Sequence, residues 1–255
     1  MRKPLIAGNW KMNKSQGDLA TYFKDLCAAS RIDKKEIAAK VDVLIAAPYT
    51  MLQKASELCE GKNITIASQN VHFEASGAFT GEISIPMLLE VGVRAAVIGH
   101  SERRQFYGET DSSVAQKVKV CLEKSVMPIA CVGETREERE AGKTKQVVSQ
   151  QLIAIMKGLS EPKNLVIAYE PVWAIGTGLT ATNMQAQEVH HLIRILLADQ
   201  FGKEAAEKIR ILYGGSAKPD NIAGLLGEAD IDGALIGGAS LKAADLAAMV
   251  VAAAL

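Results

Sequence analysis

Three side chains in this sequence could together move a proton next to a carbonyl group: Glu170, His100 and Lys11. A glutamate takes a proton from carbon when a closed, dry site raises its pKa toward neutrality. His100 precedes residues 101–104, the expected start of a helix, and a helix N-terminus disfavours imidazolium. A neutral His100 would donate a hydrogen bond to a carbonyl oxygen. Lys11 would supply fixed positive charge to a developing enediolate and to a phosphate.

Each of these residues also has a plainer interpretation. An isolated lysine is more often a solvated charge, and an isolated histidine is more often a core or surface residue with its hydrogen bonds met. Glu170 could simply cap a helix or pair with an arginine. The position of the three favours chemistry, because each follows a short apolar run, and Asn9 precedes Lys11 after the same run. If these runs are barrel strands, the side chains share one rim, where ligands bind.

Two glycine pairs suggest what the ligand carries. Gly214-Gly215, followed by Ser216, comes after the seventh apolar run, and Gly237-Gly238 comes after the eighth. Glycine lets the backbone approach closely and turn its N–H groups toward one point, and barrels commonly bind phosphate in these two loops. A single pair would favour a tight turn alone, whereas two pairs on adjacent strand ends predict a small phosphorylated substrate. Nothing in the sequence calls for a metal or a redox cofactor.

The elements that must position these groups are short β-rich runs that alternate with helical patterns. The runs are apolar on consecutive residues, which is typical of strands buried on both faces of a parallel sheet. Eight βα units predict a (β/α)8 barrel, with residues 1–255 as one domain, over an open doubly wound sheet, whose Gly-x-Gly-x-x-Gly fingerprint does not follow the first run. The expected strands are 4–9, 41–47, 64–70, 95–99, 127–132, 165–169, 209–213 and 233–236.

Charge and cysteine usage narrow the partners. Lysine plus arginine equals aspartate plus glutamate at 29 each, so no global field would recruit nucleic acid or an anionic membrane. The apolar run behind the basic N-terminus ends at Gly8, too short for a signal peptide, and the apolar tail 246–255 is too short to span a bilayer. We expect a cytoplasmic protein. Its four cysteines are scattered, as expected for free thiols: Cys27, Cys59, Cys121 and Cys131.

Seven motifs are spread over the whole chain: GNWKMN (8–13), SQNVHFEASGAFTGEIS (68–84), IGHSERR (98–104), CVGET (131–135), AYEPVWAIGTG (168–178), YGGSA (213–217) and GGASL (237–241). In order and spacing they resemble the signatures of the triosephosphate isomerase family. The resemblance implies a TIM barrel that interconverts dihydroxyacetone phosphate and D-glyceraldehyde 3-phosphate through an enediol(ate). It also implies that no cofactor is used and that the reaction serves glycolysis and gluconeogenesis.

The resemblance also implies roles for individual residues. Glu170 is the base and neutral His100 the electrophile, while Asn9 and Lys11 contact the substrate and Glu102 is a partner of Lys11. The phosphate is held by four backbone amides, those of Gly176, Ser216, Gly237 and Gly238.

A lid is predicted over residues 171–181. A proline stiffens one end, glycines make the other end pliable, and the apolar middle around Trp173 would exclude water when the lid covers the site. Two positions depart from the resemblance. Leu179 stands where the family usually has lysine, which concerns the rate of lid opening, and Ala217 stands where many members have valine.

The connection 71–84 is long and carries Phe73 and Phe79, which is uncommon unless such a loop packs on something. It could fold back on its own barrel. The resemblance implies instead that it docks into a second subunit, with Phe79, Thr80 and Met12 in the contact. We expect a homodimer whose separated subunits are nearly inactive.

Two alternatives stay open at this stage. One is another sugar-phosphate barrel enzyme, such as an aldolase, which would need a Schiff-base lysine deep in the barrel; no lysine lies inside the apolar core of an expected strand. The other is a non-catalytic, phosphate-binding barrel. Such a barrel has no need of a catalytic group, yet Lys11, His100 and Glu170 are all present.

Overall fold

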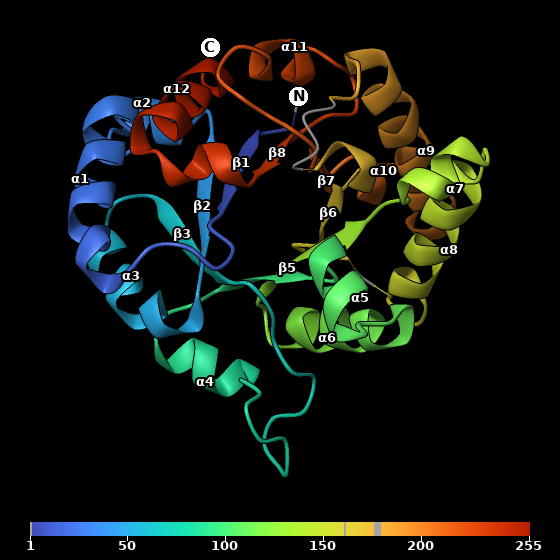
Figure 1. Cartoon of the computed structure of the whole chain (residues 1–255), viewed down its shortest axis with the longest axis horizontal. Helices are drawn as coiled ribbons and strands as arrows, with labels where there is room; N and C mark the ends of the chain where they lie inside the picture. Colours follow the sequence, from blue (N-terminus) through green and yellow to red (C-terminus); the bar gives the residue numbers. More distant parts are fainter. Residues whose placement is uncertain (1, 161, 176–179) are drawn as a thin grey trace.

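The computed structural model describes residues 2–160, 162–175 and 180–255. Eight parallel strands among these residues close into a barrel in sequence order, with β1 pairing β8 (Figure 1). Every expected strand is confirmed, with its ends within two residues of the prediction. The strands are β1 (Leu5–Asn9), β2 (Asp42–Ala47), β3 (Ile64–Ser68), β4 (Ala95–Ile98), β5 (Met127–Val132), β6 (Val166–Tyr169), β7 (Arg210–Tyr213) and β8 (Gly233–Ile236).

The consecutive apolar residues of each strand separate into two cores, because successive side chains point to opposite faces. Leu5 and Ala7 of β1 belong to a cluster inside the barrel, whereas Ile6 between them packs with the helices outside. The inner cluster is rich in alanine and also contains Leu44, Val97, Ile129, Leu212 and Leu235. Both faces of the sheet are therefore buried, and the strands read as apolar throughout.

Helices surround the barrel (Figure 1). Some of them begin at clear sequence signals, such as Thr182 before α9. The Thr182 hydroxyl accepts a hydrogen bond from the backbone N–H of Gln185, and the Gln185 side chain accepts one from the backbone N–H of Thr182. The longer helices are α1 (Leu19–Ser30), α3 (Leu52–Cys59), α6 (Asp111–Glu123), α8 (Thr144–Met156), α9 (Asn183–Phe201) and α12 (Ala243–Ala253). The shorter ones are α2 (Lys35–Ala38), α4 (Ile85–Glu90), α5 (Ser101–Tyr107), α7 (Arg136–Glu140), α10 (Lys203–Ala206) and α11 (Ile222–Leu226).

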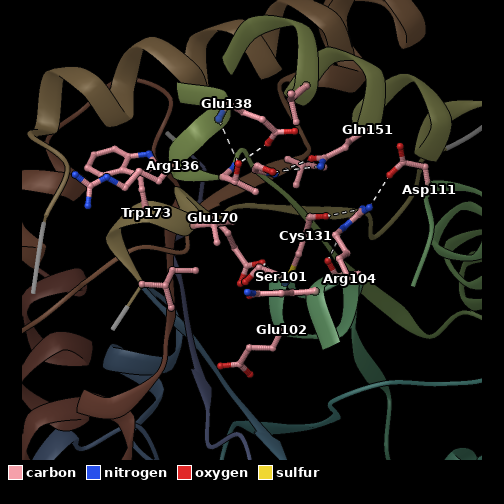
Figure 2. A pocket seen from close by; sticks show the side chains of 18 of the residues that line it. Ser101, Glu102, Arg104, Asp111, Cys131, Arg136, Glu138, Gln151, Glu170 and Trp173 are labelled. Atoms are coloured by element: carbon pink, nitrogen blue, oxygen red, sulfur yellow. Dashed lines mark hydrogen bonds and ion pairs between the residues drawn. The ribbon is translucent and has the colours of Figure 1, made fainter. Parts of the chain in front are cut away.

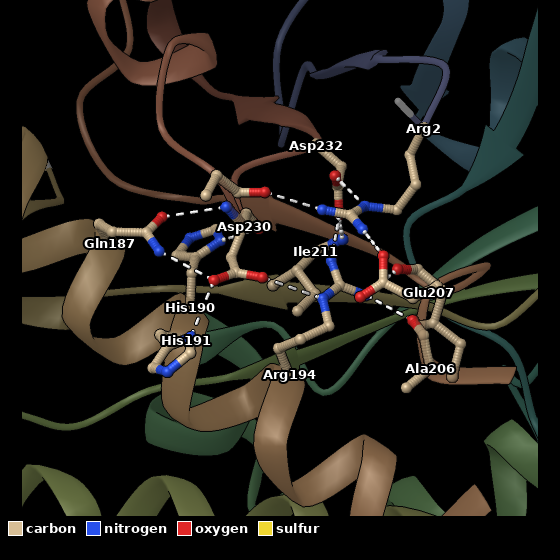
Figure 3. Close-up of polar contacts among 12 residues, drawn as sticks. Arg2, Gln187, His190, His191, Arg194, Ala206, Glu207, Ile211, Asp230 and Asp232 are labelled. Atoms are coloured by element: carbon tan, nitrogen blue, oxygen red, sulfur yellow. Dashed lines mark hydrogen bonds and ion pairs between the residues drawn. The ribbon is translucent and has the colours of Figure 1, made fainter. Parts of the chain in front are cut away.

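Two further features lie outside the barrel and its ring of helices or at the opposite ends of the strands. The segment 71–84 between β3 and α4 projects from the body of the barrel (Figure 1). At the amino ends, Arg2, His190, Arg194, Asp230 and Asp232 form a polar group that we call the amino-end cluster (Figure 3). No helix in the described part of the chain is both long and apolar enough to cross a membrane.

Candidate active site

The carboxyl ends of the strands bring seven of the eight predicted catalytic and phosphate-binding residues that the structure describes into one cavity of about 260 Å³. These are Asn9, Lys11, His100, Glu170, Ser216, Gly237 and Gly238. The eighth, Glu102, stands behind Lys11, with 2.6 Å between Lys11 Nζ and Glu102 Oε1. Gly176 lies outside the described residues. Within the described chain, no group of three or more His, Cys, Asp or Glu side chains is arranged to hold a metal ion.

Glu170 follows β6 directly and is almost wholly buried, with 2% of its surface exposed. Its Oε1 lies 2.9 Å from His100 Nε2. Its Oε2 accepts a hydrogen bond of 2.8 Å from the backbone N–H of Ser101, which lies next to Glu170 in Figure 2. Burial alone would raise the pKa of Glu170, but His100 and the Ser101 N–H outweigh it, so the pKa is lowered. In this arrangement the side chain is an ionised carboxylate.

His100 is the residue before α5, as the sequence predicted, and its Nδ1 accepts a hydrogen bond of 3.2 Å from the N–H of Glu102. An accepting Nδ1 carries no proton, so the ring proton sits on Nε2 and points at Glu170. Burial lowers the pKa of His100, but the facing charge of Glu170 outweighs burial and raises it. The helix start thus fixes the tautomer, while Glu170 sets the direction of the pKa shift.

Lys11 adopts an unusual backbone conformation, with φ of 51°. A non-glycine residue at positive φ is strained, and surrounding contacts must hold it there. Its N–H donates to Asn9 Oδ1 at 3.0 Å, and its carbonyl accepts from Gln69 Nε2 at 2.9 Å. These contacts aim the side chain across the cavity toward Gly237, where an added Cβ would lie 3.8 Å from Lys11 Nζ.

The two glycine-rich turns line the same cavity as Glu170, and the first turn lies beside it, since a Cβ added to Gly214 would come within 2.8 Å of Glu170 Cγ. Gly215 has no space for a side chain, since an added Cβ would meet the Tyr213 hydroxyl at 2.3 Å. Gly238 begins a short 3-10 helix (Gly238–Leu241). Across the described residues, the backbone N–H groups of Ser216 and Gly238 donate to no protein acceptor. Both line the cavity, so they are available to an anion.

A buried carboxylate that the sequence reading did not single out lies behind the start of the predicted lid. Glu134 is fully buried, and its Oε1 accepts hydrogen bonds from Trp173 Nε1 at 3.0 Å and from the Tyr169 hydroxyl at 3.1 Å. Arg139 pairs with the same oxygen. The available signal was a charged residue two positions after the apolar run of β5, similar to the signal that marked Glu170 directly after β6. Of the lid, residues 176–179, with Leu179, lie outside the described residues.

A second and larger cavity, of about 860 Å³, lies on the other side of Glu170 (Figure 2). Glu170 and Ile175 line both cavities and separate them. The remaining wall of this larger cavity comes from α5, the start of α6, the end of β5, α7, α8 and the lid residues Val172 and Trp173.

Residues 4–253 of this chain match the family model described as Triosephosphate isomerase. The chain belongs to the triosephosphate isomerase family. Its relatives of that name include proteins from Carboxydothermus hydrogenoformans, 51% identical over 252 residues, and from Citrifermentans bemidjiense, 48% identical over 253; each alignment covers 98% of both chains. A third, from Clostridium acetobutylicum, is 48% identical over 98% of this chain and 99% of the relative. The family resemblance of the seven motifs is thereby confirmed.

Proposed function

We propose that this chain interconverts dihydroxyacetone phosphate and D-glyceraldehyde 3-phosphate. One observation carries the proposal: the buried Glu170 carboxylate and the His100 imidazole face a small cavity on whose wall the backbone N–H groups of Ser216 and Gly238 have no acceptor among the described residues. A phosphate would bind at Ser216, Gly237 and Gly238, and the carbon skeleton would then lie between that wall and the carboxylate. Membership of the family supports the same reaction.

In the proposed reaction Glu170 exchanges its present partners for the substrate. The carboxylate takes a proton from C1 of the ketone, the C–H electron pair forms the C1–C2 double bond, and the carbonyl π electrons move to the C2 oxygen. His100 Nε2–H and the Lys11 ammonium stabilise that oxyanion. The proton then returns to C2, the C2 oxygen gains a proton and the C1 hydroxyl loses one, which yields the aldehyde. No electrons are gained or lost, so no redox cofactor is required.

The lid would keep water from this intermediate. Residues 171–181 would cover the enediolate, and exclusion of water would slow loss of phosphate to methylglyoxal. The Trp173–Glu134 hydrogen bond ties the first part of this segment to the end of β5, which gives the lid a fixed point next to Glu170.

We also propose that the active form is a homodimer made through the loop 71–84. In this loop the His72 ring contacts the rings of Phe73 and Phe79, with centroids 4.4 and 4.2 Å away, yet 42% of Phe79 stays exposed. Thr80 of the same loop is exposed, and 95% of Met12, next in sequence to Lys11 of the candidate site, is exposed. A second copy would cover these surfaces. Sedimentation should find a dimer, and a fully active monomer at working concentration would contradict the proposal.

The reaction would operate in the cytoplasm, in glycolysis and gluconeogenesis. All four cysteines are free thiols, and Cys59, Cys121 and Cys131 are buried, which suits a reducing compartment.

The test is an assay of the purified protein on D-glyceraldehyde 3-phosphate, with Glu170→Gln as the diagnostic variant. Loss of a positioned base should lower kcat by ~10² to 10⁴-fold. The matched control is Glu137→Gln, an exposed rim glutamate outside the 260 Å³ cavity, which should keep full activity. Binding of the triose without turnover by the unmodified protein would favour the non-catalytic barrel, and turnover of a different sugar phosphate would favour another barrel enzyme.

A further inference from the structure

Strand β5 is longer than its neighbour β4 at the end where the candidate site lies. The pairing of the two strands stops at Ile98 opposite Ala130, and Gly99, with φ of 72°, turns the chain away toward His100. Strand β5 continues to Val132 and its backbone runs on through Gly133. Among the described residues, no strand therefore lies beside the edge of β5 that faced β4 at the level of Glu170.

Two side chains take the place of the missing strand. Arg104 of α5 donates to the Gly99 carbonyl at 2.8 Å and to the Cys131 carbonyl at 3.2 Å. Gln151 of α8 makes a matched pair of bonds with one residue: its Oε1 accepts from Gly133 N at 2.7 Å, and its Nε2 donates to Gly133 O at 3.2 Å (Figure 2). A glutamine amide presents the same donor and acceptor as a backbone peptide, so Gln151 supplies the two hydrogen bonds that a neighbouring strand would give to Gly133.

The opposite edge of the same segment holds Glu170. The N–H of Glu170 donates to the Val132 carbonyl at 2.7 Å, and that of Val172 donates to the Glu134 carbonyl at 3.1 Å, so the two bonds bracket Gly133. Contact here is direct, because a Cβ added to Gly133 would lie 1.8 Å from the Glu170 carbonyl oxygen. The Gly133 peptide is thus held between Gln151 on one side and the backbone of Glu170 on the other.

We propose that Gln151 is a positioning residue for Glu170. It touches neither the 260 Å³ cavity nor the Glu170 carboxylate, and it acts by fixing the Gly133 peptide against which Glu170 rests. The inference rests on the proposed isomerase function with Glu170 as base. A base must be held within about 0.5 Å of its productive position. A small shift of Gly133 would move Glu170 and would therefore lower the reaction rate.

The first test replaces Gln151 by methionine, which has similar length and leaves both polar groups of Gly133 without this partner. We expect kcat to fall by about 10-fold with KM changed by less than about 2-fold, because the base moves while the phosphate wall does not. The matched control is Gln150→Met, one residue earlier on the same helix and exposed to the same larger cavity. Within the described chain Gln150 makes no hydrogen bond to Gly133, and its replacement should leave kcat unchanged.

The second test replaces Gln151 by glutamate and gives a signature that loss of stability alone would not produce. A protonated glutamate reproduces the donor and acceptor of the amide, whereas a carboxylate faces the Gly133 carbonyl with negative charge. Repulsion from that carbonyl raises the pKa of the new carboxyl above its usual ~4.3. The ratio of variant to wild-type kcat should therefore fall as the pH rises from about 5 to 8.

Other titrating groups do not obscure this ratio, since they are present in both proteins. Those around the same cavity are Glu102 and Arg104 of α5, Asp111 of α6, Cys131 of β5, Arg136, Glu137 and Glu138 of α7, and Glu170 itself.

The outcomes separate the two proposals. An unmodified protein that does not isomerise the triose phosphates refutes the proposed function. With an active wild type, a Gln151→Met kcat equal to that of Gln150→Met, or a pH-independent ratio for Gln151→Glu, overturns the role of Gln151. If Gln151→Met does not fold, the Gln151→Glu ratio decides alone.

Discussion

Buried charge lies at both ends of this barrel, but it is held differently at each end. At the amino ends, the Arg194 guanidinium donates to Asp230, Asp232 and the carbonyls of Ala206 and Ile209, all from within the protein (Figure 3). At the carboxyl ends, the oxygens of Glu170 contact the His100 ring and a backbone N–H, and the carboxylate also faces a cavity. Arg194 therefore finds all of these partners inside the protein, whereas the partners of Glu170 are ones that a ligand can replace.

This difference explains how the same kinds of side chain stabilise the fold at one end and are available for chemistry at the other. A buried ion that loses its partner is costly, so the amino-end cluster tolerates no exchange. The carboxyl end keeps its charges beside open volume and beside the strained backbone of Lys11. Replacements at the amino ends should therefore lower the unfolding free energy, whereas replacements at the carboxyl ends should lower kcat.

The largest expected effect on stability comes from Arg194→Met. It leaves Asp230 and Asp232 buried without this cation, and breaking a buried pair in this way costs about 3–5 kcal/mol of unfolding free energy. Denaturant unfolding measures that loss, and kcat per folded molecule should stay at the wild-type value. The reverse pattern is expected for Glu170→Gln, with lost activity and an unfolding free energy within about 1 kcal/mol of wild type. Equal loss of stability in both variants would erase the distinction.

The second prediction concerns His190, which is fully buried next to Asp230, Arg194 and the rings of Tyr169 and Tyr213. Burial lowers its pKa to about 4. As the pH falls below the unfolded value of ~6.5, the unfolded chain binds a proton that the folded protein does not. The contribution of His190 to the unfolding free energy is therefore fully present at pH 7. It should be lost as the pH falls from about 6.5 to 4, which lowers the unfolding free energy by about 3 kcal/mol.

His190→Asn is the matching variant, because the asparagine amide keeps a donor for the Asp230 carbonyl and does not titrate. Its unfolding free energy, measured from pH 7 to pH 4, should vary less steeply than that of the wild type. Identical slopes would show that His190 is not the residue whose titration weakens this end.

The smallest effect is expected for Arg2→Met, at the solvent edge of the same cluster. Arg2 pairs with Asp232 and with Glu207, whose side chain is 52% exposed. Asp232 keeps Arg194 and the Ile211 N–H after the change, so the loss should be about 1 kcal/mol. Thermal unfolding of the two variants compares this loss of stability with that of Arg194→Met. If Arg2→Met lost as much stability as Arg194→Met, the cluster would act as one unit.

Much of the candidate site was predictable because of a property of parallel barrels. The end of every strand falls on one rim, so a polar residue directly after an apolar run is placed without knowledge of its contacts. That rule located Asn9, Lys11, His100 and Glu170, and the glycine pairs followed from the same rule. The pKa shifts were not predictable in this way. A helix start suggested only a neutral His100, and a dry site only a raised pKa for Glu170, while each pKa depends on the other group facing it.

By itself the sequence determined the local features of this protein: the strand pattern, the helix starts, the family motifs and the order of rim residues. Only the tertiary structure decided which distant groups meet. Gln151 holds Gly133, Glu134 accepts from Trp173, and Arg194 joins Asp230 and Asp232. The physical reason is that periodicity and turn chemistry act over a few residues. A hydrogen bond between separate elements is fixed only when the closed barrel sets their distance.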